Sequence, residues 1–348
     1  QRRYWKEASA PLDSIGLESP QNYRLKTNWY NPYKQRWTRD IWPNQSTSIR
    51  AQNETTDIMI LELKKKSFQE TFNLDSLWGG ITTSFYSGDH DQTQSKFFEI
   101  WLQGTEGNLT VDLGKISEDK NGDGSLNTED QPEAGLTLGN GFLEDHEDVG
   151  LDGCPDELED GYGFCLESLP DPEGSYDPYD GFSPEDPNGD NWYFSEQNPE
   201  EYSQVNGTEG NGTGTQIQEG GKYPDTEDLD RSGFIDKTNQ YFTKTISLGD
   251  SSYIGGKTSK EWRLYRIPLS HFGKVSNIEW NEIRYLRLVW SGLDWSDSSE
   301  KELNIAKIEL VGNEWQELGV SPITEDTYAR EDSIFSIAVI NTEDNADY

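Results

Sequence analysis

Residues 119–130, with the sequence DKNGDGSLNTED, have the residue types and spacing of a calcium-binding loop. Oxygen-bearing side chains stand at its first, third, fifth, seventh and twelfth positions: Asp119, Asn121, Asp123, Ser125 and Asp130. Ca²⁺ takes about six to eight oxygen ligands, and the glycine at the sixth position permits the sharp turn that the chain must make around the ion. Because no flanking helices are evident, we expect the loop of an EF-hand without its helices. An acidic, solvated turn is the alternative.

Two further acidic stretches have related spacing. The sequence DLDRSGFID places four donors around a glycine: Asp228, Asp230, Ser232 and Asp236. The sequence HEDVGLDGCPDELED repeats aspartate at every fourth position, and its first three are Asp148, Asp152 and Asp156. This repeat resembles the Asp-rich repeats of thrombospondin-type calcium loops, and a surface helical turn is its alternative. Calcium is therefore the expected cofactor, bound at more than one loop.

The two cysteines, Cys154 and Cys165, lie in or beside the third acidic stretch. In so acidic and calcium-like a chain we expect a local disulfide and an oxidising compartment. Two free thiols are the alternative. A zinc site is disfavoured because no histidine or second cysteine pair lies at suitable spacing.

The composition narrows the possible partners. A formal net charge of −36 disfavours nucleic acid, whose phosphates must be neutralised by basic side chains. It also destabilises the compact state by self-repulsion unless bound cations offset it. No HExxH, GxSxG or phosphate-binding glycine loop occurs, so we predict that the chain is not an enzyme.

The elements that must position these loops are strands. Short apolar or alternating segments, typical of β-structure, occur at 57–64, 97–103, 109–114, 241–248, 262–269, 283–290, 303–311 and 334–340. In 109–114 the alternation turns Leu109, Val111 and Leu113 inward, with Thr110 and Asp112 outward. The predicted fold is mainly β: an antiparallel, jelly-roll-like β-sandwich with a long acidic calcium-binding loop insertion.

The predicted organisation has five parts. They are an irregular N-terminal segment (1–56), the first half of the sandwich (57–114), the acidic insertion (115–238), the second half (239–315) and a C-terminal extension (316–348). We expect strands on the two sides of the insertion to pair in one sheet system. No membrane-spanning helix is expected, because no run of about 18 apolar residues occurs.

Several segments resemble SprA, the family of giant outer-membrane translocons of the type IX secretion system that is linked to gliding motility. The segments lie in the same order in both: FFEIWLQGTEGNLTVDLGKISED (97–119), EDVGLDG (147–153), DPNGDNW (186–192), YSQVNGTEGN (202–211), YPDTEDLDRSGFID (223–236), EWRLYRIPLS (261–270), IAKIELVGNEW (305–315) and INTEDNADY (340–348). The chain is far shorter than members of that family, and no barrel strands are identifiable in it.

The resemblance implies a fragment or single module of a translocon, at the outer membrane or cell surface, with a scaffold role. Its implied partners are other parts of the translocon chain, a PorV-like protein at the lateral opening, a periplasmic plug and secreted cargo. The competing hypothesis is a carbohydrate-binding module or adhesin with calcium loops. Its glycan platforms would be Trp280, Trp290 and Trp295, although core or loop packing is the favoured interpretation for most of these three.

Overall fold

The computed structural model describes most of the chain outside the middle of the insertion. The described residues are 5–12, 18–43, 54–85, 88–130, 132, 139–144, 147–151, 153–159, 191–195, 197–202, 205, 223–298 and 300–312. The segments predicted at 316–348, including the strand at 334–340, lie outside this set. In the described part no helix is long and apolar enough to cross a membrane.

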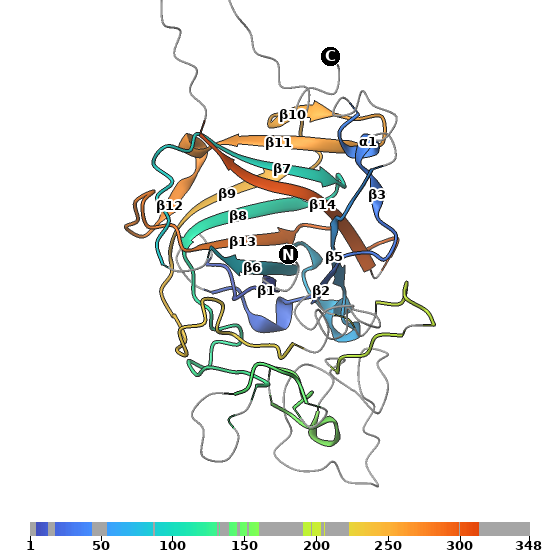
Figure 1. The fold of residues 1–348 in the computed structure, drawn as a ribbon, viewed down its shortest axis with the longest axis vertical. Helices are drawn as coiled ribbons and strands as arrows, with labels where there is room; N and C mark the ends of the chain where they lie inside the picture. The colour runs from blue at the N-terminus through green and yellow to red at the C-terminus, as the bar shows by residue number, and fades with distance from the viewer. Residues whose placement is uncertain are drawn as a thin grey trace, which may run out of the picture.

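Two antiparallel sheets of six strands each make up the fold (Figure 1). The first sheet has, in spatial order, β1 (Trp5–Glu7), β6 (Trp78–Ser84), β13 (Tyr285–Ser291), β8 (Asn108–Lys115), β9 (Gln240–Ser247) and β12 (Gly273–Val275). The second has β10 (Ile254–Lys257), β11 (Trp262–Pro268), β7 (Phe97–Gln103), β14 (Glu300–Val311), β5 (Met59–Lys64) and β2 (Lys26–Tyr30).

The remaining elements are short. A two-stranded ribbon joins β3 (Arg36–Trp37) to β4 (Thr55–Thr56), and α1 (Thr38–Ile41) follows β3 directly. The described 3₁₀ turns cover Gln21–Tyr23, Ser67–Thr71, Leu74–Ser76, Asp156–Leu158 and Leu269–His271. The prediction of a mainly β, antiparallel chain with almost no helix is therefore confirmed for the described residues.

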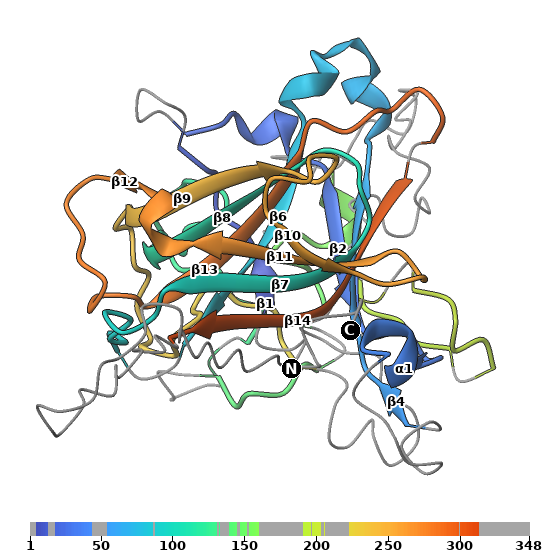
Figure 2. The same cartoon turned by 90° about the horizontal axis from the view of Figure 1, so that it is seen from above.

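One apolar core lies between the two sheets. Side chains from both sheets belong to the same buried cluster, including Val111 and Leu288 from the first sheet and Leu61 and Ile100 from the second. Their alternation along each strand follows from the two-residue period of β-structure. Figure 2 shows the same strands seen from above. The antiparallel sheets and the shared core are consistent with a β-sandwich.

The acidic insertion leaves and re-enters the fold at one place. β8 ends at Lys115 and β9 begins at Gln240, and these two residues are direct register partners in the first sheet. Strands from before and after the insertion also interleave, because β13 lies between β6 and β8, and β14 lies between β5 and β7. The described parts of the insertion gather below β1 and β6 in the view of Figure 1.

The outer face of the first sheet is covered, which differs from the sequence prediction for Asp112. That carboxylate is 1% exposed and lies 2.8 Å from the guanidinium of Arg287, whose side chain is fully buried. Residues 8–10 run over the pair, and Arg287 donates to the carbonyl oxygens of Ser9 and Ala10, at 3.3 Å each. A segment predicted to be irregular thus covers a buried ion pair. It also contributes β1 and, further along, β2 to the edges of the two sheets.

Candidate metal centre

The first acidic loop (residues 119–130) starts where β8 leaves the sheet. Ile116, one residue beyond the strand, is 1% exposed and packs with Leu229, Tyr241 and Tyr285. Leu229 belongs to the second acidic loop (residues 228–236), so one small apolar cluster anchors both loops to the first sheet. Burial of these side chains fixes the starting points of two polar segments that have little apolar surface of their own.

The side chains of the first acidic loop fold back on their own backbone. Asp119 accepts hydrogen bonds from the backbone N–H groups of Gly122, at 2.7 Å, and Gly124, at 2.9 Å. Asn121 accepts from Asp123 N at 2.9 Å, and Asp123 accepts from Ser125 N at 2.6 Å. The last bond lowers the pKa of the Asp123 carboxyl. The side chains at the first, third and fifth positions therefore each bond to the backbone of one tight turn.

The second acidic loop has the same local geometry. Asp228 accepts from Ser232 N at 2.9 Å and from Gly233 N at 2.8 Å, and Asp230 also accepts from Ser232 N, at 3.1 Å. The left-handed backbone falls at matching positions in the two loops. At the fourth position φ is 81° in Gly122 and 60° in Arg231, and at the sixth it is 77° in both Gly124 and Gly233. Two stretches far apart in the sequence thus make the same turn.

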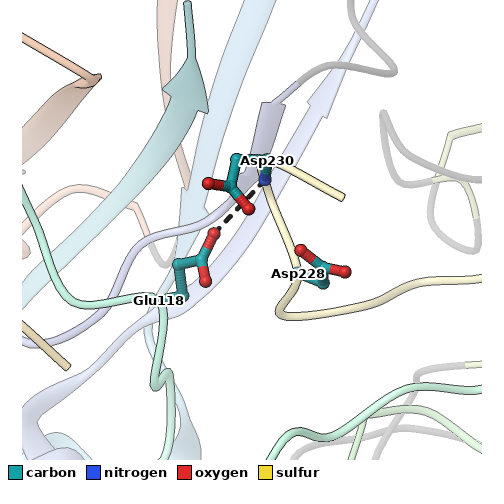
Figure 3. Close-up of side chains that lie close together, drawn as sticks. All are labelled: Glu118, Asp228 and Asp230. Atoms are coloured by element: carbon teal, nitrogen blue, oxygen red, sulfur yellow. Dashed lines mark hydrogen bonds between the residues drawn. The ribbon is translucent and has the colours of Figure 1, made fainter. Parts of the chain in front are cut away.

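Glu118, the residue just before the first loop, reaches into the second. Its carboxylate accepts hydrogen bonds from Leu229 N and Asp236 N, both at 2.9 Å. One carboxylate oxygen from each of Glu118, Asp228 and Asp230 lies within 4.8 Å of the other two. Figure 3 shows these three side chains close together. Oxygens on opposite sides of one Ca²⁺ are about 4.6–5.2 Å apart, twice the usual Ca–O distance, so this spacing fits a single ion.

Glu227, the residue just before the second loop, reaches into the first in the same way. Its carboxylate accepts from Lys120 N at 2.7 Å and from Asn127 N at 3.0 Å. Lys120 and Asn127 hold the second and ninth positions of the first loop, as Leu229 and Asp236 do in the second. The negative charge of Asp119 is close enough to raise the pKa of Glu227, although burial is the larger cause.

The carboxylates at the base of the two loops are buried, and the nearby lysines pair with other acids: Lys6 with Asp225 and Lys120 with Glu7. Glu118, Glu129 and Glu227 are 2%, 1% and 2% exposed, and none forms an ion pair within the part of the chain that the structure describes. Burial raises the pKa of Glu118 to about 7 and that of Glu129 to about 8. Oxygen Oε1 of Glu129 is buried with no hydrogen-bond partner among the described residues. Buried anions are costly unless they are paired or coordinate a metal, so this donor set fits a hard divalent cation.

The other predicted ligands take different positions. Asp130 is not seen to close the first loop: its carboxylate accepts from Gly141 N at 3.0 Å. Asp236 pairs with Arg284 at 2.9 Å. Ser125 is exposed, and the Ser232 hydroxyl donates to the carbonyl of Phe234 at 3.0 Å.

In the third stretch, Asp148 and Asp156 both contact the chain near residue 191. Asp148 accepts from Trp192 N at 2.9 Å, and Asp156 accepts from the side-chain amide of Asn191 at 3.0 Å. Cys154 is fully buried and disulfide-bonded. Asp152 and Cys165 lie outside the described residues.

The three tryptophans of the glycan hypothesis are not surface platforms. Trp290 is 2% exposed and Trp295 is 6% exposed, and both belong to the main core. Trp280 packs against that core, with its ring stacked on Phe242 at a centroid distance of 3.7 Å. The large apolar side chains that are exposed in the described residues are elsewhere: Tyr33, Trp37, Phe142, Tyr193 and Phe234.

Sequence reasoning missed Glu118 and Glu227, although a signal for them was present. Both loops begin with the same pair of residues, Glu-Asp, followed by the alternating donors and the glycine. An alignment of the two loops with each other would have marked the glutamate as a shared position. Comparison with known proteins adds no identity, because no family model and no curated protein matches the chain.

Proposed function

We propose that this protein is a structural, calcium-stabilised β-sandwich module with jelly-roll-like topology. Ca²⁺ bound in the two acidic loops would fix the acidic insertion to the first sheet. The observation that carries the proposal is the set of buried carboxylates that form no ion pair among the described residues, at the base of two loops with the same turn. A bound cation would remove their charge repulsion and would offset part of the self-repulsion of a chain with net charge −36.

The wider role that we propose is scaffold or partner contact in a SprA-like outer-membrane translocon, without chemistry of its own. The support is the series of segments between residues 97 and 348 that resemble that family in the same order. The module would lie at the outer membrane or cell surface and would contact other parts of the translocon chain, a PorV-like protein, the plug or secreted cargo. An oxidising location suits the disulfide at Cys154.

Thermal unfolding with and without Ca²⁺ tests the calcium part. A ligand present at about 100 times its Kd stabilises the folded state by about 2.7 kcal/mol per site. Two such sites give about 5 kcal/mol, and each kcal/mol shifts the Tm of a large domain by about 2–4 °C. We therefore expect EGTA to lower the Tm by about 10 °C or more. The same Tm in Ca²⁺ and in EGTA would refute the calcium proposal.

A pair of variants tests whether the effect of Ca²⁺ on the Tm comes from the first loop. Asp123→Ala removes a donor from the first loop and should reproduce much of the EGTA effect. Asp250→Ala is the matched control, because Asp250 also accepts from a backbone N–H two residues ahead, at 3.0 Å, but lies in a turn after β9. It should leave the response to Ca²⁺ unchanged.

Binding measurements separate the two roles. A translocon module should co-elute with a PorV-like partner or the plug in Ca²⁺ and should show no binding on a glycan array. A glycan hit that is lost when an exposed aromatic such as Trp37 is replaced would favour the adhesin instead.

A further inference from the structure

The two acidic loops are joined by backbone contacts that repeat at equivalent positions. Glu118 N donates to the carbonyl oxygen of Asp236 at 2.7 Å, and Glu227 N donates to that of Asn127 at 3.0 Å. In each case the residue before one loop bonds to the ninth residue of the other. These main-chain bonds and the two glutamate carboxylates relate the loops by an approximate two-fold axis.

The contacts also continue beyond the loops. Thr128 and Thr226 form an antiparallel bridge, and Glu129 N donates to the carbonyl oxygen of Asp225 at 3.0 Å. In return, Asp225 N donates to the Glu129 carboxylate at 2.5 Å. The end of the first loop and the approach to the second are thus held as a short two-stranded ribbon, so neither loop can change its backbone without disturbing the other.

We propose that the two loops bind two divalent cations as one cooperative unit, in which the glutamate before each loop serves the site in the other loop. This inference rests on the calcium binding proposed above. Glu118 supplies a carboxylate beside Asp228 and Asp230, and it is covalently joined to Asp119, the first donor of the other site. Glu227 reaches the first loop through the backbone N–H groups of Lys120 and Asn127 and is joined to Asp228, although its carboxylate does not meet those of Asp119 and Asp123 within the same spacing.

The coupling has a physical cause in the ordering of the two loops. A cation that fixes Glu118 in the second site also fixes the chain direction at Asp119, so the first loop has less conformational freedom left to lose. Ligand binding that orders part of a second site gives positive cooperativity. Such coupling typically amounts to a factor of about 5–150 in affinity.

Calorimetric titration of the chelator-stripped protein with Ca²⁺ tests the proposal. The wild type should take up two loop-bound ions in a single cooperative phase with a Hill coefficient above 1. Asp119→Ala should abolish binding at the first loop and weaken the site that remains by about tenfold. Asp228→Ala should have the reciprocal effect on the first loop. The variant that combines Asp119→Ala with Asp228→Ala should lose both loop sites. Any Ca²⁺ that it still binds measures the background from other acidic residues of the insertion.

Two further variants test whether the glutamate before a loop takes part in binding. Glu227→Gln keeps an oxygen for the backbone N–H groups but loses the charge, and it should weaken both ions. Asp250→Ala, outside the loops, should change neither. Circular dichroism in EGTA checks that each variant keeps the β-signal of the wild type. If Asp119→Ala does not fold, the stepwise constants of the wild-type titration still decide the question.

The outcomes separate this inference from the proposed function. No Ca²⁺ uptake by the wild type overturns both. Two independent sites overturn only the coupling, as does an unchanged affinity at the second loop in Asp119→Ala. Uptake of a single loop-bound ion also overturns the coupling, but it leaves the proposed stabilisation of the module by Ca²⁺ in place.

Discussion

Removing one partner of the buried Asp112–Arg287 pair should destabilise the protein strongly. In Asp112→Asn the guanidinium keeps its charge inside the first sheet but loses its carboxylate, which the Nε and Nη2 atoms each approach to 2.8 Å. Breaking a buried ion pair in this way costs about 3–5 kcal/mol. The Tyr241 ring, 4.9 Å from the guanidinium carbon, and the carbonyl oxygens of Ser9 and Ala10 retain some stabilisation of the cation. We therefore expect a loss of about 3 kcal/mol.

Urea unfolding followed by tryptophan fluorescence, in saturating Ca²⁺, measures this loss apart from the metal sites. The double variant Asp112→Asn with Arg287→Met should lose less than the sum of the two single variants, because no unpaired charge remains. Glu261→Gln is the control, since it removes an ion pair with Lys257 in which both side chains are about half exposed. It should shift the unfolding midpoint far less. A loss below about 1 kcal/mol for Asp112→Asn would refute the argument.

Limited proteolysis of Arg287→Met should reveal whether this side chain holds residues 8–10 in place. Because Arg287 donates to Ser9 and Ala10, Arg287→Met should release this segment from the face of the first sheet. Limited proteolysis should then cut near residue 10 sooner in the variant than in the wild type. Equal cleavage rates would show that the segment is held by other contacts, such as the hydrogen bond from Ser9 Oγ to Ser117 O at 2.6 Å.

Three further predictions concern other parts of the molecule. Burial raises the pKa of Glu129 from its usual range to about 8, so its contribution to stability is present below pH about 4.5 and is lost as the pH rises toward 8. In EGTA, the free energy of unfolding of the wild type should therefore fall over that pH interval by up to about 5 kcal/mol more than that of Glu129→Gln. Urea titrations at several pH values measure both. Gly80→Ala should destabilise strongly in the same assay, because its Cβ would lie 2.4 Å from a backbone oxygen, whereas Gly255→Ala, with its nearest atoms at 3.6 Å, should be tolerated. Reduction of the Cys154 disulfide should speed proteolysis within residues 148–166, and the same cleavage pattern in both redox states would contradict a structural role for it.

The strands were predictable because their signal is local. Leu109, Val111 and Leu113 alternate with polar residues, and all three are fully buried between the sheets. A two-residue period needs no knowledge of the partner strand, so β7, β8, β11 and β13 follow from the sequence to within a few residues. The turns of the acidic loops are equally local, since Asp119 bonds to N–H groups only three and five residues ahead.

The parts that escaped prediction depend on contacts between distant residues. Asp112 was expected to face solvent because its own strand carries no sign of the cover formed by residues 8–10. The roles of Glu118 and Glu227 arise only when two loops near opposite ends of the insertion come together. In each case the deciding partner is far away in the chain.

The register of β8 and β9 has a consequence for how this fold can vary. Because Lys115 and Gln240 face each other across neighbouring strands, the two ends of the insertion are held side by side by the sheet itself. The entropy cost of closing a loop grows only slowly with its length when its ends are already fixed. The sandwich can therefore accept segments of very different size at this junction, from a tight hairpin turn to a separate folded domain. The junction between β8 and β9 is thus a natural grafting point, where new surfaces can be added or exchanged while the core remains intact.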